Sequence, residues 1–208
     1  MKGYISVIDK RTQFLKELFI NDGFTIVDYQ KDLDFYFINQ EEKPDCPYVF
    51  TFNDSKGIYV INNDKVFRHL NNTLTVNAFF MYLKKIFTNK KILVLGYGDL
   101  AKQLLNILKR NHNQLTVANR NYKDLAEIKK DFQHLDIHLL TGRYDYIINT
   151  IPNLNIDYTD VRYKKIYDLA QTRDMRNYVS LRNLPNLYFP YESALLMFCY
   201  IKDVMKNV

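Results

Sequence analysis

The sequence predicts an α/β protein in which a parallel-sheet domain follows a smaller α/β domain. From Lys91 onward, strand-like runs alternate with segments of helical periodicity, a pattern typical of a parallel sheet with right-handed crossovers. Before Lys91, short apolar runs recur with helical segments and no glycine-rich loop. We expect a small domain over 1–88, a dinucleotide-binding domain over 89–190, and a terminal helix over 191–208 that packs back on the first domain.

Each element of the first domain rests on its own pattern. Strands are expected over 4–8, 24–27, 35–38, 48–52 and 58–61, where short apolar runs are separated by turn-forming residues. A helix should contain the apolar residues Phe14 to Phe19 and end at Gly23. A second helix is expected over about 75–87, and the polar residues that follow it mark the domain boundary.

The second domain is predicted in the same way. Strands are expected over 92–95, 115–118 and 146–150, with helices over 99–110 and 122–132 between them. Later apolar runs predict strands over 166–169 and 187–189 and a last helix over about 192–205. This domain is therefore expected to be Rossmann-like.

Composition limits the classes of function. The 208 residues carry a net charge of +6, but Lys and Arg are scattered, whereas a nucleic-acid site would gather them on one face. The two cysteines lie far apart and in no zinc-ligand spacing, so neither a disulfide framework nor a metal site is expected. No apolar stretch approaches the ~18 residues of a membrane span, and no leader pattern is present. We expect a cytoplasmic protein.

The segment Gly96-Tyr97-Gly98-Asp99-Leu100-Ala101 is the strongest functional motif, because it joins a clear strand to a clear helix. The first glycine permits a tight turn, the second allows a pyrophosphate to approach, and alanine suits the third, small position. The alternative is a plain strand-to-helix turn. Asp99 would repel phosphate unless it turned outward, and we expect it to cap the helix.

The end of the next strand bears on the choice of nucleotide. NAD sites usually place Asp or Glu there, to bind the ribose 2′-hydroxyl. This chain has Asn119, Arg120 and Asn121 instead. A guanidinium matches the 2′-phosphate of NADP, so the sequence predicts NADP(H) in preference to NAD(H). The alternative is that Arg120 only faces solvent.

A third segment, Asn149 to Pro152, follows a strand at the edge where α/β sheets bind ligands. It could border the nicotinamide ribose, or it could simply end the strand. The residues expected to bind the cofactor are Gly96, Tyr97, Gly98, Asp99, Leu100, Ala101, Asn119, Arg120, Asn121, Asn149, Thr150, Ile151 and Pro152.

Candidates for catalysis are few. His69 is a candidate proton donor, Arg68 could pair with a carboxylate substrate, and Asp168, after a strand, could orient a residue of the site. His69 could equally be a solvated surface residue, and Asp168 could cap a turn. The sequence does not assign a catalytic residue.

Six segments together resemble the A subunit of bacterial dipicolinate synthase, a two-domain NAD(P)-dependent oxidoreductase, over about residues 71–194. The segment Ile148-Asn149-Thr150-Ile151-Pro152 is the most specific, since the family has Asn-Thr-Ile-Pro there. The others are Asn72 to Ala78, Leu93 to Gly98, Val117 to Arg120 with Asp124 to Ile128, Asp168 to Ala170, and Leu184-Pro185 with Pro190. The Asn-Arg-Asn end is also similar to that of shikimate dehydrogenases, which use NADP.

The sequence departs from this family where the family holds its substrate. A Pro-Gly-Gly turn that follows Asp-Leu-Ala-Ser in the family is replaced by Gln171 to Asp174, and Asn186 stands in place of a glycine. The chain is also shorter. The resemblance implies an oxidoreductase, or its cofactor-binding subunit, acting on a small carboxylate held between the domains. The alternative is a non-catalytic, diverged Rossmann protein that binds a nucleotide or a protein partner, and a homodimer or a partner subunit fits either function.

Overall fold

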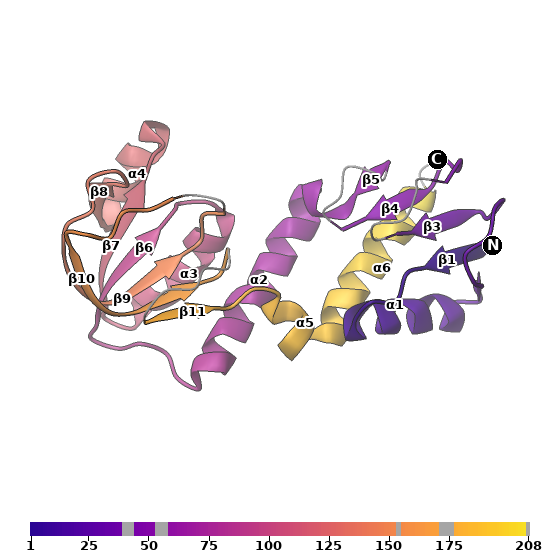
Figure 1. The fold of residues 1–208 in the computed structure, drawn as a ribbon, viewed down its shortest axis with the longest axis horizontal. Helices are drawn as coiled ribbons and strands as arrows, with labels where there is room; N and C mark the ends of the chain where they lie inside the picture. The colour runs from indigo at the N-terminus through magenta and orange to yellow at the C-terminus, as the bar shows by residue number, and fades with distance from the viewer. Residues whose placement is uncertain (39–43, 53–57, 153–154, 171–176, 207–208) are drawn as a thin grey trace. The chain divides into compact units, whose positions relative to one another are not determined.

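The computed structural model describes residues 1–38, 44–52, 58–152, 155–170 and 177–206. They form two compact units, one made of Met1–Leu74 and Pro185–Val208 and the other of Thr75–Leu184 (Figure 1). Each unit contains one parallel sheet. Helix α2 (Lys65–Leu83) contributes residues to both units.

The sheet of the first unit has five short strands. They are β1 (Lys2–Ile5), β2 (Thr25–Ile26), β3 (Phe35–Phe37), β4 (Val49–Thr51) and β5 (Tyr59–Val60). Their order across the sheet is β2-β1-β3-β4-β5, and all of them run parallel. A short 3-10 helix, η1 (Ile61–Asn63), leads from the last strand toward α2. The carboxyl ends of all five strands therefore meet at one edge of the sheet.

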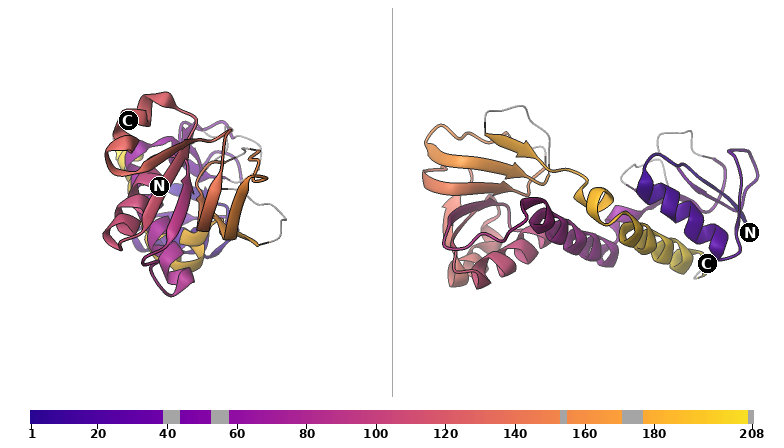
Figure 2. Two further views of the ribbon diagram at one scale, coloured as in Figure 1. Left: turned by 90° about the vertical axis from the view of Figure 1, so that its left-hand side faces the viewer. Right: turned by 90° about the horizontal axis from the view of Figure 1, so that it is seen from below.

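Two helices from opposite ends of the chain cover one face of this sheet. Helix α1 (Lys10–Asn21) begins at Asp9, whose carboxylate accepts a hydrogen bond from the Thr12 backbone N–H at 2.9 Å. Helix α6 (Pro190–Lys206) lies beside it (Figure 2). The ring of Phe14 meets Tyr191 and that of Phe19 meets Phe198, so the two helices run in the same direction.

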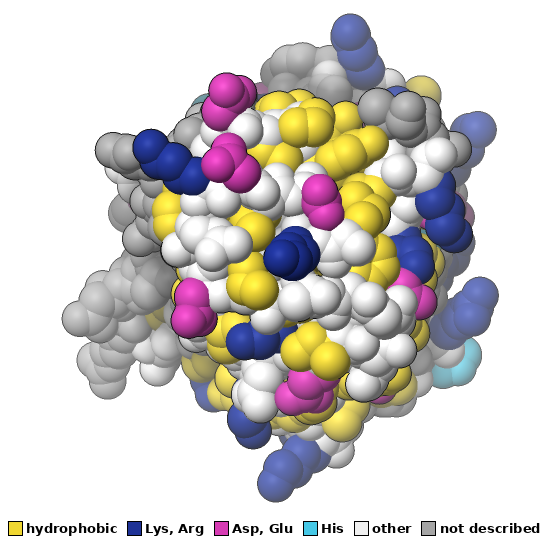
Figure 3. Space-filling view, turned by 90° about the vertical axis from the view of Figure 1, so that its right-hand side faces the viewer, with side chains coloured by type: hydrophobic (Ala, Val, Ile, Leu, Met, Phe, Trp, Pro, Cys, Tyr) yellow, Lys and Arg dark blue, Asp and Glu magenta, His cyan; other side chains and the backbone are white. Residues whose placement is uncertain are grey.

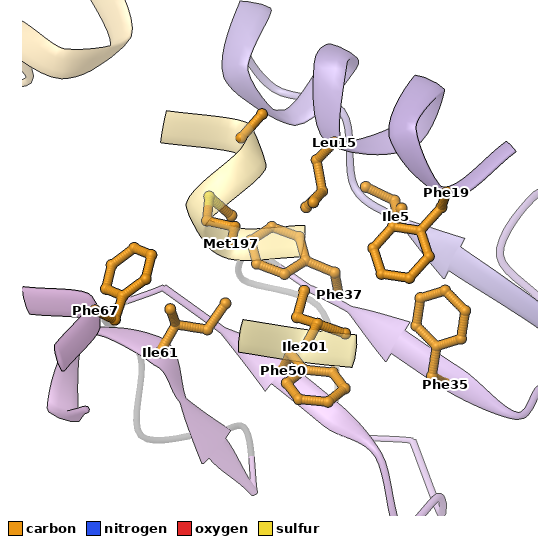
Figure 4. Packing of buried hydrophobic residues seen from close by; sticks show 11 residues of the cluster. Ile5, Leu15, Phe19, Phe35, Phe37, Phe50, Ile61, Phe67, Met197 and Ile201 are labelled. Carbon is orange, nitrogen blue, oxygen red and sulfur yellow. The ribbon is translucent and has the colours of Figure 1, made fainter. Parts of the chain in front are cut away.

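The core of the first unit lies between these two helices and the sheet. Phe19 is at its centre, with ring centroids 5.1 Å from Phe24, 5.0 Å from Phe35 and 4.8 Å from Phe198. Figure 4 shows labelled core side chains from α1, α6 and the strands pointing toward one another, with Ile61 of η1 and Phe67 of α2 beside them. The buried members are Ile5, Leu15, Phe19, Phe35, Phe37, Phe50, Ile61, Phe67, Ala194, Met197 and Ile201.

The sheet of the second unit has six parallel strands. They are β6 (Lys91–Leu95), β7 (Gln114–Asn119), β8 (Gln133–Asp136), β9 (Gly142–Asn149), β10 (Val161–Asp168) and β11 (Tyr178–Ser180). Their order across the sheet is β11-β10-β9-β6-β7-β8. Numbered within the unit and read from the β8 edge, this is the order 3-2-1-4-5-6 of the Rossmann fold. The order of the strands reverses between β6 and β9.

The helices of the second unit are α3 (Asp99–Arg110), η2 (Tyr122–Asp124) and α4 (Leu125–Asp131), and α5 (Leu184–Tyr188) begins at its last residue. Helix α3 packs on β6 and β7 through residues one turn apart, Ala101, Leu104, Leu105 and Leu108, all of which are buried. The second half of α2 and Phe87, which follows the helix, add an aromatic cluster. The ring of Phe79 lies 5.6 Å from Tyr167, and that of Phe87 lies 4.2 Å from Tyr146.

The predicted fold class is confirmed. The second sheet is Rossmann-like, and α6 packs on the first unit. The compact units divide at Leu74 and Leu184, whereas the sequence predicted boundaries at 88 and 190. The earlier division follows from packing, because α2 already contributes Phe79 to the aromatic cluster of the second unit.

Several elements differ from the prediction. Residues 187–189 were predicted as a strand, but Leu187 and Tyr188 lie in α5, and α6 begins at Pro190. Proline suits the first turn of a helix, since its missing N–H would have no partner there. Helix α2 begins ten residues earlier than expected, at Lys65. Strands β8 and β11 were not predicted.

The structure also bears on membrane spans, metal ligands and surface charge. Within the described residues, no helix is long and apolar enough to cross a membrane, and no group of three or more potential metal-ligating side chains occurs. On the face of the first unit in Figure 3, basic and acidic side chains are interspersed among apolar ones. The described part of this face therefore carries no extended patch of one charge.

Phe19 lies at the centre of the aromatic core of the first unit, so its removal tests that core. We expect Phe19→Ala to lower the free energy of unfolding by about 3–5 kcal/mol, because the site cannot collapse around the lost ring. Ile20→Ala is the matched control, since Ile20 is 48% exposed on the same helix. Its removal should lower the free energy of unfolding far less. Urea unfolding measures both. Equal losses for the two variants would contradict the assignment of this core.

Candidate functional site

The glycine turn begins where β6 ends, and its first glycine is required by the backbone. Gly96 has φ of +101°, a conformation that L side chains rarely adopt. A Cβ atom built on Gly96 would lie 2.5 Å from Thr150 Oγ1 and 3.0 Å from Ile151 Cγ1. Both the conformation and the close approach of Thr150 therefore exclude a side chain at this position.

Backbone hydrogen bonds fix the turn between two neighbouring strands. The Gly96 N–H donates to the Ala118 carbonyl on β7 at 2.8 Å. On the other side, Thr150 donates to the Leu95 carbonyl through its N–H at 3.0 Å and its hydroxyl at 2.7 Å. The turn thus lies at the carboxyl ends of the strands where the strand order reverses, the place where open α/β sheets bind ligands.

The second glycine leaves open space in front of helix α3. Gly98 is the N-cap of α3 and is exposed, with no side chain capping the helix. A Cβ atom built on Gly98 would have no described heavy atom within 4 Å. The first N–H groups of any helix lack partners within the helix, and the helix dipole adds partial positive charge there. An anion placed beside Gly98 would meet both.

The prediction that Asp99 caps the helix was wrong. Asp99 is the first residue of α3, and its carboxylate accepts a hydrogen bond from the Gln103 amide at 2.9 Å. The carboxylate is therefore held along the helix by a residue one turn later, and it adds a favourable first-turn charge. Ala101 is fully buried, as expected for the small position of the motif, and Leu100 is half-buried.

Tyr97 holds the turn against α4 through contacts that the sequence did not suggest. Its hydroxyl donates to Glu127 Oε1 at 3.1 Å, and Lys102 Nζ lies 4.7 Å from its ring centroid. Lys102 also bonds Glu127 at 3.0 Å. Burial and the Glu127 carboxylate together raise the pKa of Tyr97 to about 12. The side chain between the two glycines is thus clamped and neutral.

At the end of β7, the two asparagines shape the loop and the arginine projects from it. The Asn119 amide donates to the Asn121 carbonyl at 3.2 Å and to Asp124 Oδ2 at 3.1 Å. Asn121 Oδ1 accepts the Lys123 N–H at 3.1 Å. Arg120 is exposed between them. The loop is therefore ordered by Asn119 and Asn121, and the Arg120 guanidinium is available to a ligand.

Asn149 is held by a buried carboxylate on the neighbouring strand. Its amide donates to Asp168 Oδ2 at 2.8 Å and to the Ile151 carbonyl at 3.1 Å, while Asn149 Oδ1 accepts the Ile151 N–H at 3.0 Å. Asp168 is fully buried and also accepts the Ala170 N–H at 2.8 Å and the Tyr178 hydroxyl. This network fixes the segment that presses on Gly96.

The network also bears on the predicted roles of these residues. The Asp168 carboxylate is bound to the Asn149 amide and the Tyr178 hydroxyl, so it holds the Asn149 side chain in place. Pro152 is exposed just after the strand. Arg68 and His69 lie on α2 in the first unit, and both are exposed. Their predicted catalytic roles remain predictions.

The fold of the whole chain is similar to that of solved structures. No family model and no curated protein matches the sequence. The structure is similar to the A chain of dipicolinate synthase from Bacillus subtilis, with a TM-score of 0.77 and 12% identity over 100% of this chain and 96% of that one. The corresponding dipicolinate synthase structure from Bacillus halodurans gives a TM-score of 0.70 and 13% identity over 99% of this chain and 97% of that one.

A third solved structure has a more distant fold. It is a chorismate mutase/shikimate 5-dehydrogenase fusion protein from Clostridium acetobutylicum, with a TM-score of 0.50 and 13% identity over 99% of this chain and 96% of that one. At these identities the comparisons show a shared fold. The expected resemblance to the dipicolinate synthase family is confirmed at that level, across both units of the chain.

The contacts of Tyr97 with Glu127 and Lys102 predict how the stability of the protein depends on pH. Folded Tyr97 keeps its proton up to about pH 12, whereas an unfolded tyrosine loses it near pH 10. Between these values the folded state binds more protons, so the stability contributed below pH 10 is lost as pH rises toward 12. Tyr97→Phe should flatten this part of the stability curve.

Urea unfolding across this pH range measures the difference between the two proteins. Tyr82→Phe is the control, because Tyr82 is exposed and its removal should leave the curve unchanged. If the free energy of unfolding fell equally steeply between pH 10 and 12 in wild type and Tyr97→Phe, the buried contact of Tyr97 with Glu127 would be contradicted.

Proposed function

From the fold that this chain shares with the dipicolinate synthase A chain, we propose that it is an NADP(H)-binding oxidoreductase, or the cofactor-binding subunit of one, acting on a small carboxylate. The observation that carries the cofactor part is the glycine turn. Gly96 is forced into a conformation suited to glycine, and Gly98 leaves open space before the first turn of α3. Both features suit the binding of a diphosphate.

The cofactor would meet this chain at three places. The first N–H groups of α3 would bind the diphosphate, and Arg120 would bind the 2′-phosphate of the adenosine ribose. The segment after β9, held by Asn149, would border the other half of the dinucleotide. When bound, the nicotinamide would supply or accept a hydride, while the chain's own residues bind and orient the cofactor.

A buried arginine in the first unit supports a carboxylate substrate. Arg11 is on the first turn of α1, and its side chain is 9% exposed. Its Cζ lies 4.4 Å from the ring centroid of Phe52, the residue that follows β4. Arg11 is therefore at the carboxyl edge of the first sheet, the edge at which parallel sheets bind ligands.

The guanidinium of Arg11 is incompletely paired. One amino nitrogen donates to Asp9 Oδ2 at 3.4 Å, and among the described residues Nε has no hydrogen-bond partner. Burial lowers the pKa of Arg11, and Asp9 offsets only part of that effect. A guanidinium has five donors in a planar fork that matches a carboxylate. A substrate carboxylate would accept hydrogen bonds from the donors that remain. The sequence pattern alone does not single out Arg11.

One observation favours the alternative of a non-catalytic nucleotide-binding protein. Asp168, one of the three candidates for catalysis, is buried and bonded to Asn149. A protein that only senses a nucleotide needs no proton donor. Oxidation of NADPH in the presence of a panel of keto acids, imino acids and dihydropyridine carboxylates separates the two functions. Turnover with any of them supports the oxidoreductase, and binding of NADPH with no turnover on the whole panel supports the alternative.

The first test of the cofactor site replaces Gly98. We expect Gly98→Val to weaken NADPH binding about 100-fold or more, the equivalent of about 3 kcal/mol of lost hydrogen bonding to charged groups. Gly98→Ala should have a smaller effect. Because the φ of Gly98 is −74°, both variants should fold. Isothermal titration measures affinity, and full affinity in Gly98→Val would contradict this placement.

The choice of nucleotide rests on Arg120. We expect Arg120→Gln to weaken NADPH binding about 10- to 100-fold, from the loss of about 1.5–3 kcal/mol of charge-assisted bonding, and to leave NADH binding unchanged. Arg110→Gln is the control, since Arg110 is exposed at the other end of α3. Parallel losses for NADPH and NADH would argue against recognition of the 2′-phosphate.

The substrate site is tested with Arg11. With an active substrate in hand, Arg11→Lys should raise the KM about tenfold, because lysine keeps the charge and loses the fork. The affinity for NADPH should not change. Lys10→Met is the control for loss of charge at the same end of α1, since Lys10 is exposed. An unchanged KM in a folded Arg11→Lys protein would remove Arg11 from the substrate site.

A further inference from the structure

A cationic hollow lies at the amino edge of the second sheet, the edge opposite the glycine turn. It has a volume of about 510 Å³ and is formed by the first residues of β6, β9 and β10. Four of its lining residues are basic, namely Lys91, Arg143, Arg162 and Lys164. Among the described residues, Asp145 is the one acid that lines it. Four cations against one carboxylate leave three positive charges in excess.

Strand register places two of these cations side by side. Arg143 on β9 and Arg162 on β10 are direct partners in the parallel ladder. Neighbouring strands lie about 4.8 Å apart, and partners in register point to the same face. Like charges directly opposite one another destabilise a sheet. The paired arginines therefore cost stability in the absence of an anion.

The carboxylate of Asp145 is already engaged. It accepts a hydrogen bond from Lys164 Nζ at 2.6 Å and from the Lys91 N–H at 3.1 Å. These contacts lower the pKa of Asp145 and keep it charged and occupied. Within the part of the chain that the structure describes, neither Arg143 nor Arg162 forms an ion pair. Their guanidinium groups are exposed and available to a ligand.

The size and lining of the hollow indicate the class of anion. Small-molecule sites commonly measure about 300–1,000 Å³, so the hollow exceeds what inorganic phosphate alone would fill. Two neighbouring guanidinium groups can meet the several oxygens of a phosphate group. Tyr144 and Tyr163 complete the lining, and Lys91 Nζ lies 5.4 Å from the Tyr144 ring centroid. Both tyrosines also pack against the buried core of the second unit, so the room for an organic body comes from the volume of the hollow.

We propose that Arg143 and Arg162 form a binding site for a small phosphate ester at the amino edge of the second sheet. The site is separate from the proposed cofactor site, since the glycine turn follows the opposite end of β6. A single local group of cations fits a small ligand better than an extended nucleic acid, which requires a stripe of positive charge. The proposal does not depend on the proposed oxidoreductase function.

The test is a titration of the full chain with phenyl phosphate, followed by backbone amide NMR shifts. The Gly98→Val protein is used, so that binding at the glycine turn does not contribute. We expect shifts at residues 142–145 and 161–164, and at least a tenfold weaker affinity in Arg143→Gln/Arg162→Gln. The exposed pair Arg110→Gln/Arg182→Gln is the matched control and should retain affinity.

Stability gives a second readout. A ligand site with uncompensated charge predicts that Arg162→Gln raises the melting temperature of the ligand-free protein, whereas a structural role for Arg162 predicts a fall. Arg162→Lys keeps the charge, loses the fork and should bind phenyl phosphate more weakly. The proposal is overturned by any of five results: a lower melting temperature in Arg162→Gln, no shifts at millimolar phenyl phosphate, equal affinity for sulfate, equal losses in the control pair, or tighter binding of a single-stranded oligonucleotide than of phenyl phosphate.

Discussion

The close approach of Gly96 to Thr150 is the constraint on which the second unit depends. Strands β6 and β9 lie side by side at the point where the strand order reverses, and their carboxyl ends converge there. A side chain at residue 96 would collide with Thr150, while the Thr150 hydroxyl bonds the carbonyl just before the glycine. The turn can only be this tight because one partner has no side chain and the other supplies a hydrogen bond.

The surrounding residues keep that turn rigid. On one side, Asp168 fixes Asn149, and Asn149 fixes the segment that contains Thr150. On the other side, Tyr97 and Lys102 both bind Glu127 of α4. The N-terminus of α3 lies between these two supports. A preorganised set of N–H groups binds an anion at lower entropic cost than a mobile loop does.

How much of this could be predicted depends on how local each feature is. The unit β6–turn–α3 was predicted closely because one short stretch holds a buried strand, two glycines and a strongly periodic helix. The strand predicted at 187–189 was wrong because aromatic β-propensity there is overridden by Pro185 and Pro190, which favour helix starts. Propensity alone does not weigh such neighbours.

The contacts that build the sites were less accessible. Glu127 is 30 residues from Tyr97, and Arg11 meets Phe52 only after the first sheet has formed. The pairing of Arg143 with Arg162 follows from the register of β9 and β10, which is set only when the two strands pair in the sheet. The acid at 99 was misassigned as a cap, because Gly98 already occupies the N-cap position. Long-range partners of this kind come from the fold.

The most direct measurement is a crystal structure of the protein grown with saturating NADPH. We expect diphosphate density against the N–H groups of residues 98–101 and the 2′-phosphate within hydrogen-bond distance of Arg120. A structure in which protein side chains fill the space beside Gly98, or in which the dinucleotide binds elsewhere, would contradict the proposed cofactor site.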